Sequence, residues 1–112
     1  MAEHPRRDEI PPGTLYMLIL KVLRHGELHG YEIANAIQQI SADVLQVEEG
    51  SLYPALQRML LKGWVTAKWG VTAGNRRARY YRLTAAGRKQ LESEMRQYER
   101  VSGAIQKILQ TA

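Results

Sequence analysis

The chain has 112 residues and a mass of 12.8 kDa, the size of one domain, so separate catalytic and regulatory domains are not expected. It has no cysteine, which excludes disulfides, thiolate zinc sites and a cysteine nucleophile. The formal net charge of +5 favours a polyanionic partner, and the polar, proline-rich start and short apolar runs predict neither a membrane span nor a secretory signal.

Three short helices are predicted after a loose arm or a short lead-in at residues 1–12. Apolar residues at helical spacing predict the first helix over 14–24, with Thr14 as its N-cap. The second runs from 30 to about 41, and its apolar stripe is Tyr31, Ile33, Ala34, Ile37 and Ile40. The third begins at 50–51, with Ser51 as its cap, and ends at Gly63; its buried stripe is expected to be Leu52, Leu56, Met59 and Leu60.

After Gly63 the apolar residues alternate, which predicts strands over 64–69 and 78–83 joined by a turn at 70–75. We expect Trp64 and Trp69 to anchor this hairpin against the third helix, and Thr84 to cap a last helix that runs to about residue 110. The order ααα-ββ-α is that of a mainly α winged helix-turn-helix with a small β-hairpin. Residues 13–84 would form the DNA-binding domain and 85–112 a long C-terminal dimerisation helix.

The third helix is the candidate recognition element, because residues near its N-terminus reach base edges in this fold. Its outward face is expected to include Ala55 and Lys62; hydroxyls there suit phosphate, Gln57 suits adenine, and Arg58 suits guanine or phosphate. The returning hairpin strand presents three arginines suited to phosphates or a narrow minor groove. The predicted DNA-binding residues are Ser51, Tyr53, Pro54, Gln57, Arg58, Asn75, Arg76, Arg77 and Arg79. The alternatives are a core position for Tyr53 and a solvated surface for the basic residues.

Positive charge is concentrated in this part of the chain. No Asp or Glu lies between Gly50 and Leu91, whereas nine basic residues do. The rest of the chain carries seven basic residues and all 11 acidic ones. One structural unit therefore accounts for the whole positive excess.

The last helix carries apolar and small residues at heptad spacing, which predicts a seam that pairs with a second copy. The predicted dimer-interface residues are Leu91, Met95, Tyr98, Ser102, Ile105 and Leu109. Two recognition helices related by a two-fold axis would read an inverted repeat. The alternative is that this helix folds back on its own domain. Small residues at 102–104 beside Tyr98 motivate the hypothesis that a flat aromatic effector binds at Tyr98.

No enzyme or metal site is predicted, and no cofactor is expected. His4, His25 and His29 have no partners at metal-ligand spacing, and the adjacent Glu48 and Glu49 favour a helix start rather than acid–base catalysis. The chain also has no Gly-rich phosphate loop in a βαβ setting and no nucleophile elbow.

Three segments resemble the PadR family of bacterial transcriptional regulators: HGYEI at 29–33, EGSLYPAL at 49–56 and RYYRLTAAG at 79–87. The resemblance covers about residues 13–110. It implies a winged-helix repressor that dimerises through its C-terminal helix, in the compact subfamily with a single such helix. It also implies DNA contacts from Ser51, Tyr53 and Pro54 and from the basic wing. The sequence departs from many members at 59–61, where Met-Leu-Leu replaces Arg-Leu-Glu.

The sequence therefore predicts a cytoplasmic, homodimeric, sequence-specific regulator, associated with the bacterial nucleoid when bound to double-stranded promoter DNA. It is expected to be a repressor of an inverted-repeat operator, with a small aromatic effector as a further partner and no membrane association. The alternatives are a winged-helix module that binds RNA or that serves as a protein-interaction adaptor.

Overall fold

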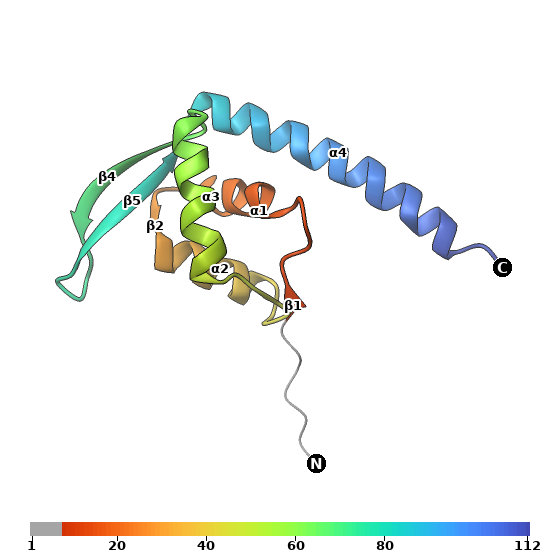
Figure 1. Cartoon of the computed structure of the whole chain (residues 1–112), viewed down its shortest axis with the longest axis horizontal. Coiled ribbons are helices and arrows are strands. Elements are labelled where there is room, and N and C mark those ends of the chain that lie inside the picture. Colours follow the sequence, from red (N-terminus) through yellow and green to blue (C-terminus); the bar gives the residue numbers. More distant parts are fainter. Residues whose placement is uncertain (1–7) are drawn as a thin grey trace, which may run out of the picture.

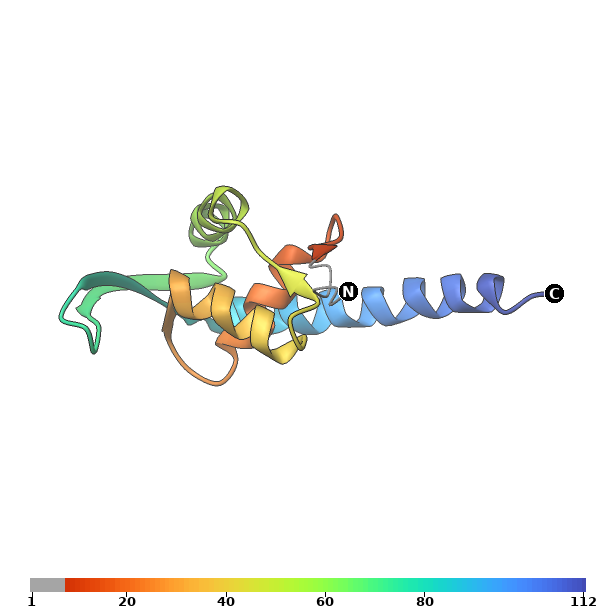
Figure 2. The same cartoon turned by 90° about the horizontal axis from the view of Figure 1, so that it is seen from below.

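The computed structural model describes residues 8–112 and confirms a mainly helical winged fold (Figure 1). Three helices, α1 (Leu15–Leu23), α2 (Gly30–Ile40) and α3 (Glu49–Leu61), pack together, and α4 (Ala85–Leu109) follows the hairpin of β4 (Val65–Val71) and β5 (Arg77–Leu83). The hairpin and the far end of α4 project in opposite directions from the three-helix unit, and a perpendicular view shows the same arrangement (Figures 1 and 2). None of the helices in the described part of the chain combines the length and apolar character that crossing a membrane requires.

The hairpin belongs to a three-stranded antiparallel sheet in the order β2-β5-β4, because β2 (Leu28–His29) pairs with β5. The sequence predicted no strand at 28–29, since two residues are too few to show an alternating pattern. The hairpin strands also extend further towards the tip than predicted. There the amide of Asn75 donates to the Thr72 carbonyl oxygen at 2.9 Å, and Asn75 adopts a φ of 60°, which closes the turn.

The described chain begins with a short strand at residues 8–9. Residues 1–7 of the predicted arm lie outside the described residues, but β1 (Asp8–Glu9) pairs in parallel with β3 (Leu45–Gln46), between α2 and α3. Residues 8–9 are therefore tied to the fold by strand pairing, which agrees with a short lead-in rather than a loose arm for these two residues.

Of the three predicted helix caps, Thr14 and Thr84 stand at the N-cap positions of α1 and α4, and Ser51 was wrong. The Thr14 hydroxyl, however, donates to the Pro11 carbonyl oxygen at 2.8 Å and does not accept a hydrogen bond from α1. Helix α3 begins at Glu49 with Glu48 at its N-cap, so Ser51 lies inside the first turn. The Thr84 hydroxyl accepts from the Gly87 amide at 3.0 Å and caps α4 as predicted.

The imidazole of His29 caps α2. Its Nδ1 accepts from the Glu32 amide at 3.3 Å, and the Glu32 carboxylate accepts from the His29 amide at 3.1 Å. This reciprocal arrangement satisfies two helix-start N–H groups and fixes the entry to α2.

A single core joins α1, α2 and α3 to the base of the wing and to the start of α4. Its most deeply buried side chains include Ile19, Leu20, Leu23, Ile33, Leu52, Leu56 and Met59. The predicted apolar stripe of α2 was wrong at its two ends. Tyr31 and Ile40 are not buried, since they are 73% and 77% exposed. Tyr31 lies near the start of the helix and Ile40 is its last residue.

Candidate nucleic-acid interface

Helix α3 has one buried and one exposed face. The buried face carries Leu52, Ala55, Leu56 and Met59, so the prediction of an outward Ala55 was wrong. The exposed face carries all five of the predicted contact residues in this helix: Ser51, Tyr53, Pro54, Gln57 and Arg58. These five side chains therefore share the solvent-facing side of α3, and this helix lies beside the wing (Figure 1).

Tyr53 is not a core aromatic, because 47% of its surface is exposed. Its ring instead lies against Gly30, the first residue of α2. This contact connects the exposed face of α3 with the start of α2.

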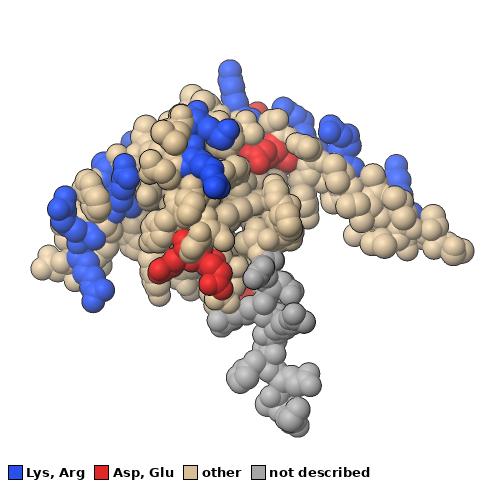
Figure 3. Space-filling model, in the orientation of Figure 1, with Lys and Arg blue, Asp and Glu red and all other residues tan. Residues whose placement is uncertain are grey.

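The wing carries the arginines predicted for DNA contact. Asn75, Arg76, Arg77 and Arg79 are all exposed, and Arg77 and Arg79 are part of β5. Figure 3 shows Lys and Arg side chains spread along the wing and over the adjoining top of the molecule. These cations therefore lie on an arm that projects from the three-helix unit.

Trp69 does not anchor the hairpin as predicted, since it is 60% exposed. The Arg77 guanidinium lies over its ring, 4.8 Å from the ring centre. Trp64 is half-buried, but its ring packs edge-on against Tyr16 of α1 at 5.7 Å rather than against the outer face of α3. The hairpin is anchored instead by Val65, Tyr81 and Leu83, which are buried in the core.

A groove of about 740 Å³ lies between the wing and the starts of α2 and α3. On one side it is lined by His29, Gly30, Tyr31 and Tyr53, and on the wing side by Trp69, Thr72, Arg76, Arg77, Ala78, Arg79 and Tyr81. Its walls combine aromatic rings with guanidinium groups, which together stack on planar groups and bind anions. Burial raises the pKa of the Tyr81 hydroxyl, and the nearby Arg79 guanidinium partly offsets that rise.

Sequence reasoning missed Trp69 and Tyr31 as parts of this surface. Residues of one strand share a face when they are two apart, and Trp69 pairs with Arg79 in the observed register. Aligning the two predicted strands around their turn would have placed the indole beside the arginines. Nothing comparable in the sequence signals the exposure of Tyr31.

The surface is not uniformly positive. Glu48 and Glu49 are exposed at the start of α3, where Figure 3 shows an acidic patch. Lys68 on the wing forms an ion pair with Glu27 at 3.5 Å. Among the side chains that the structure describes, no carboxylate lies within ion-pair distance of Arg76, Arg77 or Arg79. These three guanidinium groups retain their capacity to pair with an external anion.

The predicted seam of α4 is divided between the core and solvent. Leu91 is 3% exposed and packs in the core of its own chain, so it is not available to a second copy, and Met95 packs beside it. Tyr98, Ile105 and Leu109 are exposed, and Ser102 is half-buried. Leu91 belongs to the predicted seam because the 4-3 spacing of apolar residues begins within the part of α4 that packs against its own three-helix unit.

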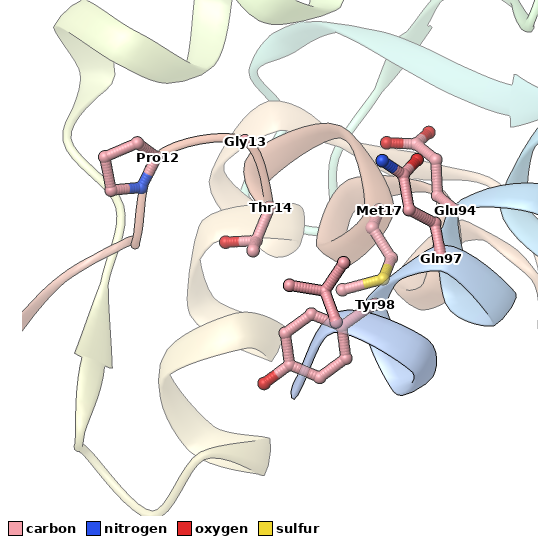
Figure 4. Close-up of a pocket in the computed structure, with 8 residues that line it drawn as sticks. Pro12, Gly13, Thr14, Met17, Glu94, Gln97 and Tyr98 are labelled. Carbon is pink, nitrogen blue, oxygen red and sulfur yellow. The ribbon is translucent and has the colours of Figure 1, made fainter. Parts of the chain in front are cut away.

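Tyr98 lines a cavity of about 250 Å³ between the start of α1 and the middle of α4 (Figure 4). The other lining residues are Pro12, Gly13, Thr14, Met17, Glu94, Gln97 and Val101. In Figure 4 Met17 and Tyr98 lie close together, and Glu94 and Gln97 come from the preceding part of α4. Burial raises the pKa of the Glu94 carboxyl, and the hydrogen bond from the Gln90 amide, at 3.3 Å, partly lowers it.

Two known transcriptional regulators are similar to this chain in sequence. A transcriptional regulator of Mycobacterium tuberculosis is 35% identical over 77% of this chain and 79% of its own length. The negative transcriptional regulator PadR of Bacillus subtilis is 27% identical over 70% of this chain and 43% of its own.

Two solved structures are similar to this chain in fold. A PadR-like transcriptional regulator from Bacillus cereus superimposes with a TM-score of 0.75 at 28% identity, over 89% of this chain and 95% of that one. Bacillus subtilis PadR in complex with operator DNA superimposes with a TM-score of 0.65 at 26% identity, over 73% of this chain and 47% of that one. The profile of the PadR-like transcriptional regulator family matches residues 19–93, and the chain belongs to this family.

Proposed function

We propose that this protein is a homodimeric repressor that binds an inverted-repeat operator in double-stranded DNA. Members of its family are transcriptional regulators and not enzymes. The observation that carries the proposal is the shared surface formed by the exposed face of α3 and the unpaired arginines of the wing. Residues 13–84 would serve as the DNA-binding unit and residues 85–112 as the dimerisation helix.

In this proposal α3 lies in the major groove and the wing follows the flanking backbone. Ser51 and Tyr53 donate hydroxyl hydrogen bonds to phosphate oxygens, and Pro54 packs against the sugar–phosphate chain. Gln57 reads adenine, and Arg58 reads guanine or binds phosphate. Asn75, Arg76, Arg77 and Arg79 bind phosphates or enter the minor groove. All of these side chains are exposed, as such roles require.

The exposed apolar side chains in the second half of α4 support dimerisation. Val101, Ile105, Ile108 and Leu109 are exposed on a helix segment that extends beyond the three-helix unit (Figures 1 and 2). A helix of 25 residues is about 38 Å long, more than a domain of this size covers. We propose that Met95, Tyr98, Ser102, Ile105 and Leu109 face a second copy, which sets the distance between two recognition helices.

Repression and response to an effector are further parts of the proposal. The relative from Bacillus subtilis is a negative transcriptional regulator, and it was crystallised with operator DNA. We propose the same sign of regulation for this protein, acting on the nucleoid in the cytoplasm. The cavity beside Tyr98 offers a ring face and the thioether of Met17, which suits a flat aromatic effector.

Selection of bound fragments from the host genome, followed by gel-shift titration, tests the proposed function. We expect recovered fragments to share an inverted repeat with half-sites about one helical turn apart. Unrelated duplex DNA should bind at least about a thousandfold more weakly at physiological salt. Gln57→Ala should alter base preference at one position per half-site, because base contacts specify the sequence. Equal binding to structured RNA, or no preference among duplexes, would contradict the proposal.

A further inference from the structure

One face of the wing carries aromatic rings and guanidinium groups in alternation. In the register of β4 with β5, Trp69 pairs with Arg79 and Val71 with Arg77. These residues share a face with Tyr81, because side chains two positions apart on a strand point the same way. The Arg79 guanidinium lies 6.0 Å from the centre of the Tyr81 ring, and that of Arg77 lies 4.8 Å from the centre of the Trp69 ring.

The rings of Tyr81 and Trp69 differ in their other packing contacts. Tyr81 is buried and belongs to the core, so its position follows from packing. Trp69 is mostly exposed and is absent from the core and from the residues packed against it. The contact that the structure shows for its ring is the one with Arg77. Core packing therefore does not explain a large indole at this place on the wing.

Stacking on the indole restricts where the Arg77 guanidinium can go. A long, exposed arginine side chain samples many rotamers in water and loses that freedom when it binds a ligand. A guanidinium that lies over a ring keeps its N–H donors at its edges, where they can meet an anion. Trp69 and Arg77 both line the groove between the wing and the starts of α2 and α3. The stack thus places the donors of Arg77 at the wall of that groove.

We propose that Trp69 is a positioning residue for DNA binding, which holds the Arg77 guanidinium towards one sugar–phosphate strand lying in this groove. This inference rests on the proposed function and adds to it the reason why the Arg77 side chain is held in one orientation on the wing. Trp69 acts through Arg77 and supplies no charge of its own. Its π face, rather than its apolar volume, is the property that matters.

A double-mutant cycle on the full chain tests the coupling between the two residues. The variants are Trp69→Leu, which keeps an apolar side chain without a ring, Trp69→Phe, which keeps a π face, Arg77→Ala, and the double variant Trp69→Leu/Arg77→Ala. Val71→Ala is the matched control, because Val71 is exposed and lies directly across from Arg77. Affinity is measured by fluorescence anisotropy with the operator fragment recovered from the genome, and thermal unfolding confirms that each variant is folded.

We expect Trp69→Leu to weaken binding by up to about fivefold per wing engaged, and Trp69→Phe and Val71→Ala to stay within about twofold of the parent. In the Arg77→Ala background, Trp69→Leu should add less than about twofold. An equal loss in both backgrounds, or an equal loss for Phe and Leu, overturns the inference. A parent that shows no preference for the operator overturns the proposed function and this inference with it. A parent that binds with the same affinity as Trp69→Leu overturns this inference alone.

Discussion

The ring of Tyr53 lies directly against Gly30, so that a β-carbon added at Gly30 would come within 2.8 Å of Tyr53 Cε1 and 2.9 Å of its hydroxyl oxygen. Gly30 is the first residue of α2, and Tyr53 stands on the exposed face of α3. The absence of a side chain at residue 30 therefore determines where the Tyr53 hydroxyl lies on the proposed DNA-binding surface.

Gly30→Ala is expected to weaken operator binding about tenfold with little loss of stability. The added carbon meets the far end of a mobile side chain, so the ring swings away while the core keeps its packing. The displaced hydroxyl then loses its hydrogen bond to a charged phosphate oxygen. Fluorescence anisotropy measures the affinity, and thermal unfolding measures the stability.

Gly70→Ala is the matched control for this variant. Its added carbon also meets a tyrosine ring, at 2.9 Å from Tyr80, which is not among the residues that line the groove. We expect operator affinity within about twofold of the parent. Equal losses of operator affinity in the two variants would show that the position of the Tyr53 ring does not affect operator binding.

Gly87→Ala is expected to destabilise the fold by about 3 kcal/mol, lowering the unfolding midpoint by more than about 10 °C. An added carbon would collide with the backbone carbonyl of Trp64 and with the side chain of Leu83. That carbonyl cannot yield, because it accepts from both the amide and the hydroxyl of Thr84 at 3.0 Å. Gly50→Ala is the control, since nothing lies within 4 Å of the added carbon and alanine favours a helix. Equal midpoints for the two variants would contradict this explanation.

The salt dependence of operator binding is expected to report the wing arginines. A dimer that engages about eight phosphates should show a slope near −7 in log affinity against log salt concentration. Arg77→Ala removes one cation per subunit and should make the slope less steep by about two. Arg96→Ala, an exposed cation on α4, should leave the slope unchanged. A slope that is the same in Arg77→Ala and in the parent would remove this residue from phosphate binding.

Glu94→Gln is expected to stabilise the protein at neutral pH and not at acid pH. Burial raises the pKa of the Glu94 carboxyl, so the folded state holds a proton that the unfolded state releases, and stability falls as pH rises through this interval. A neutral glutamine avoids this penalty and keeps an oxygen for the Gln90 amide. The unfolding midpoint of the variant should exceed that of the parent at pH 7, and the difference should vanish below about pH 4.

Glu92→Gln is the control, because it removes an exposed carboxylate two positions earlier on the same helix. Its midpoint should follow that of the parent across the pH range. If Glu94→Gln raised the unfolding midpoint by the same amount at acid pH, burial of the charge would not be the cause of the higher stability.

Ile105→Asp is expected to dissociate the proposed dimer while leaving the domain folded. The side chain is exposed in the single chain, so a charge there costs the chain itself little, whereas a charge buried at an interface is strongly unfavourable. Analytical ultracentrifugation should show a rise of more than about tenfold in the dissociation constant, with unchanged helical circular dichroism. Gln106→Asp is the control one residue further along α4. A parent that sediments as a monomer would contradict the proposed dimer.

The sequence alone determined the order of the four helices and the hairpin, most of the buried stripe of α3 and the concentration of positive charge between Gly50 and Leu91. Apolar periodicity reports which side of a helix is buried, and this local signal placed Leu52, Leu56 and Met59 correctly. The cap at Thr84 was likewise readable, because a capping threonine acts on residues three positions away.

The tertiary structure decided which apolar residues remain in solvent and what the wing arginines touch. Tyr31 and Trp69 remain mostly exposed, whereas Leu91 is buried because the first part of α4 packs against α1 before the helix projects beyond the three-helix unit. The pairing of strands across the turn brings Trp69 beneath Arg77, and the approach of α3 to α2 brings Tyr53 onto Gly30. The contact between Tyr53 and Gly30 depends on the relative placement of two helices, which local spacing does not encode, whereas the contact between Trp69 and Arg77 depends on the register of the hairpin.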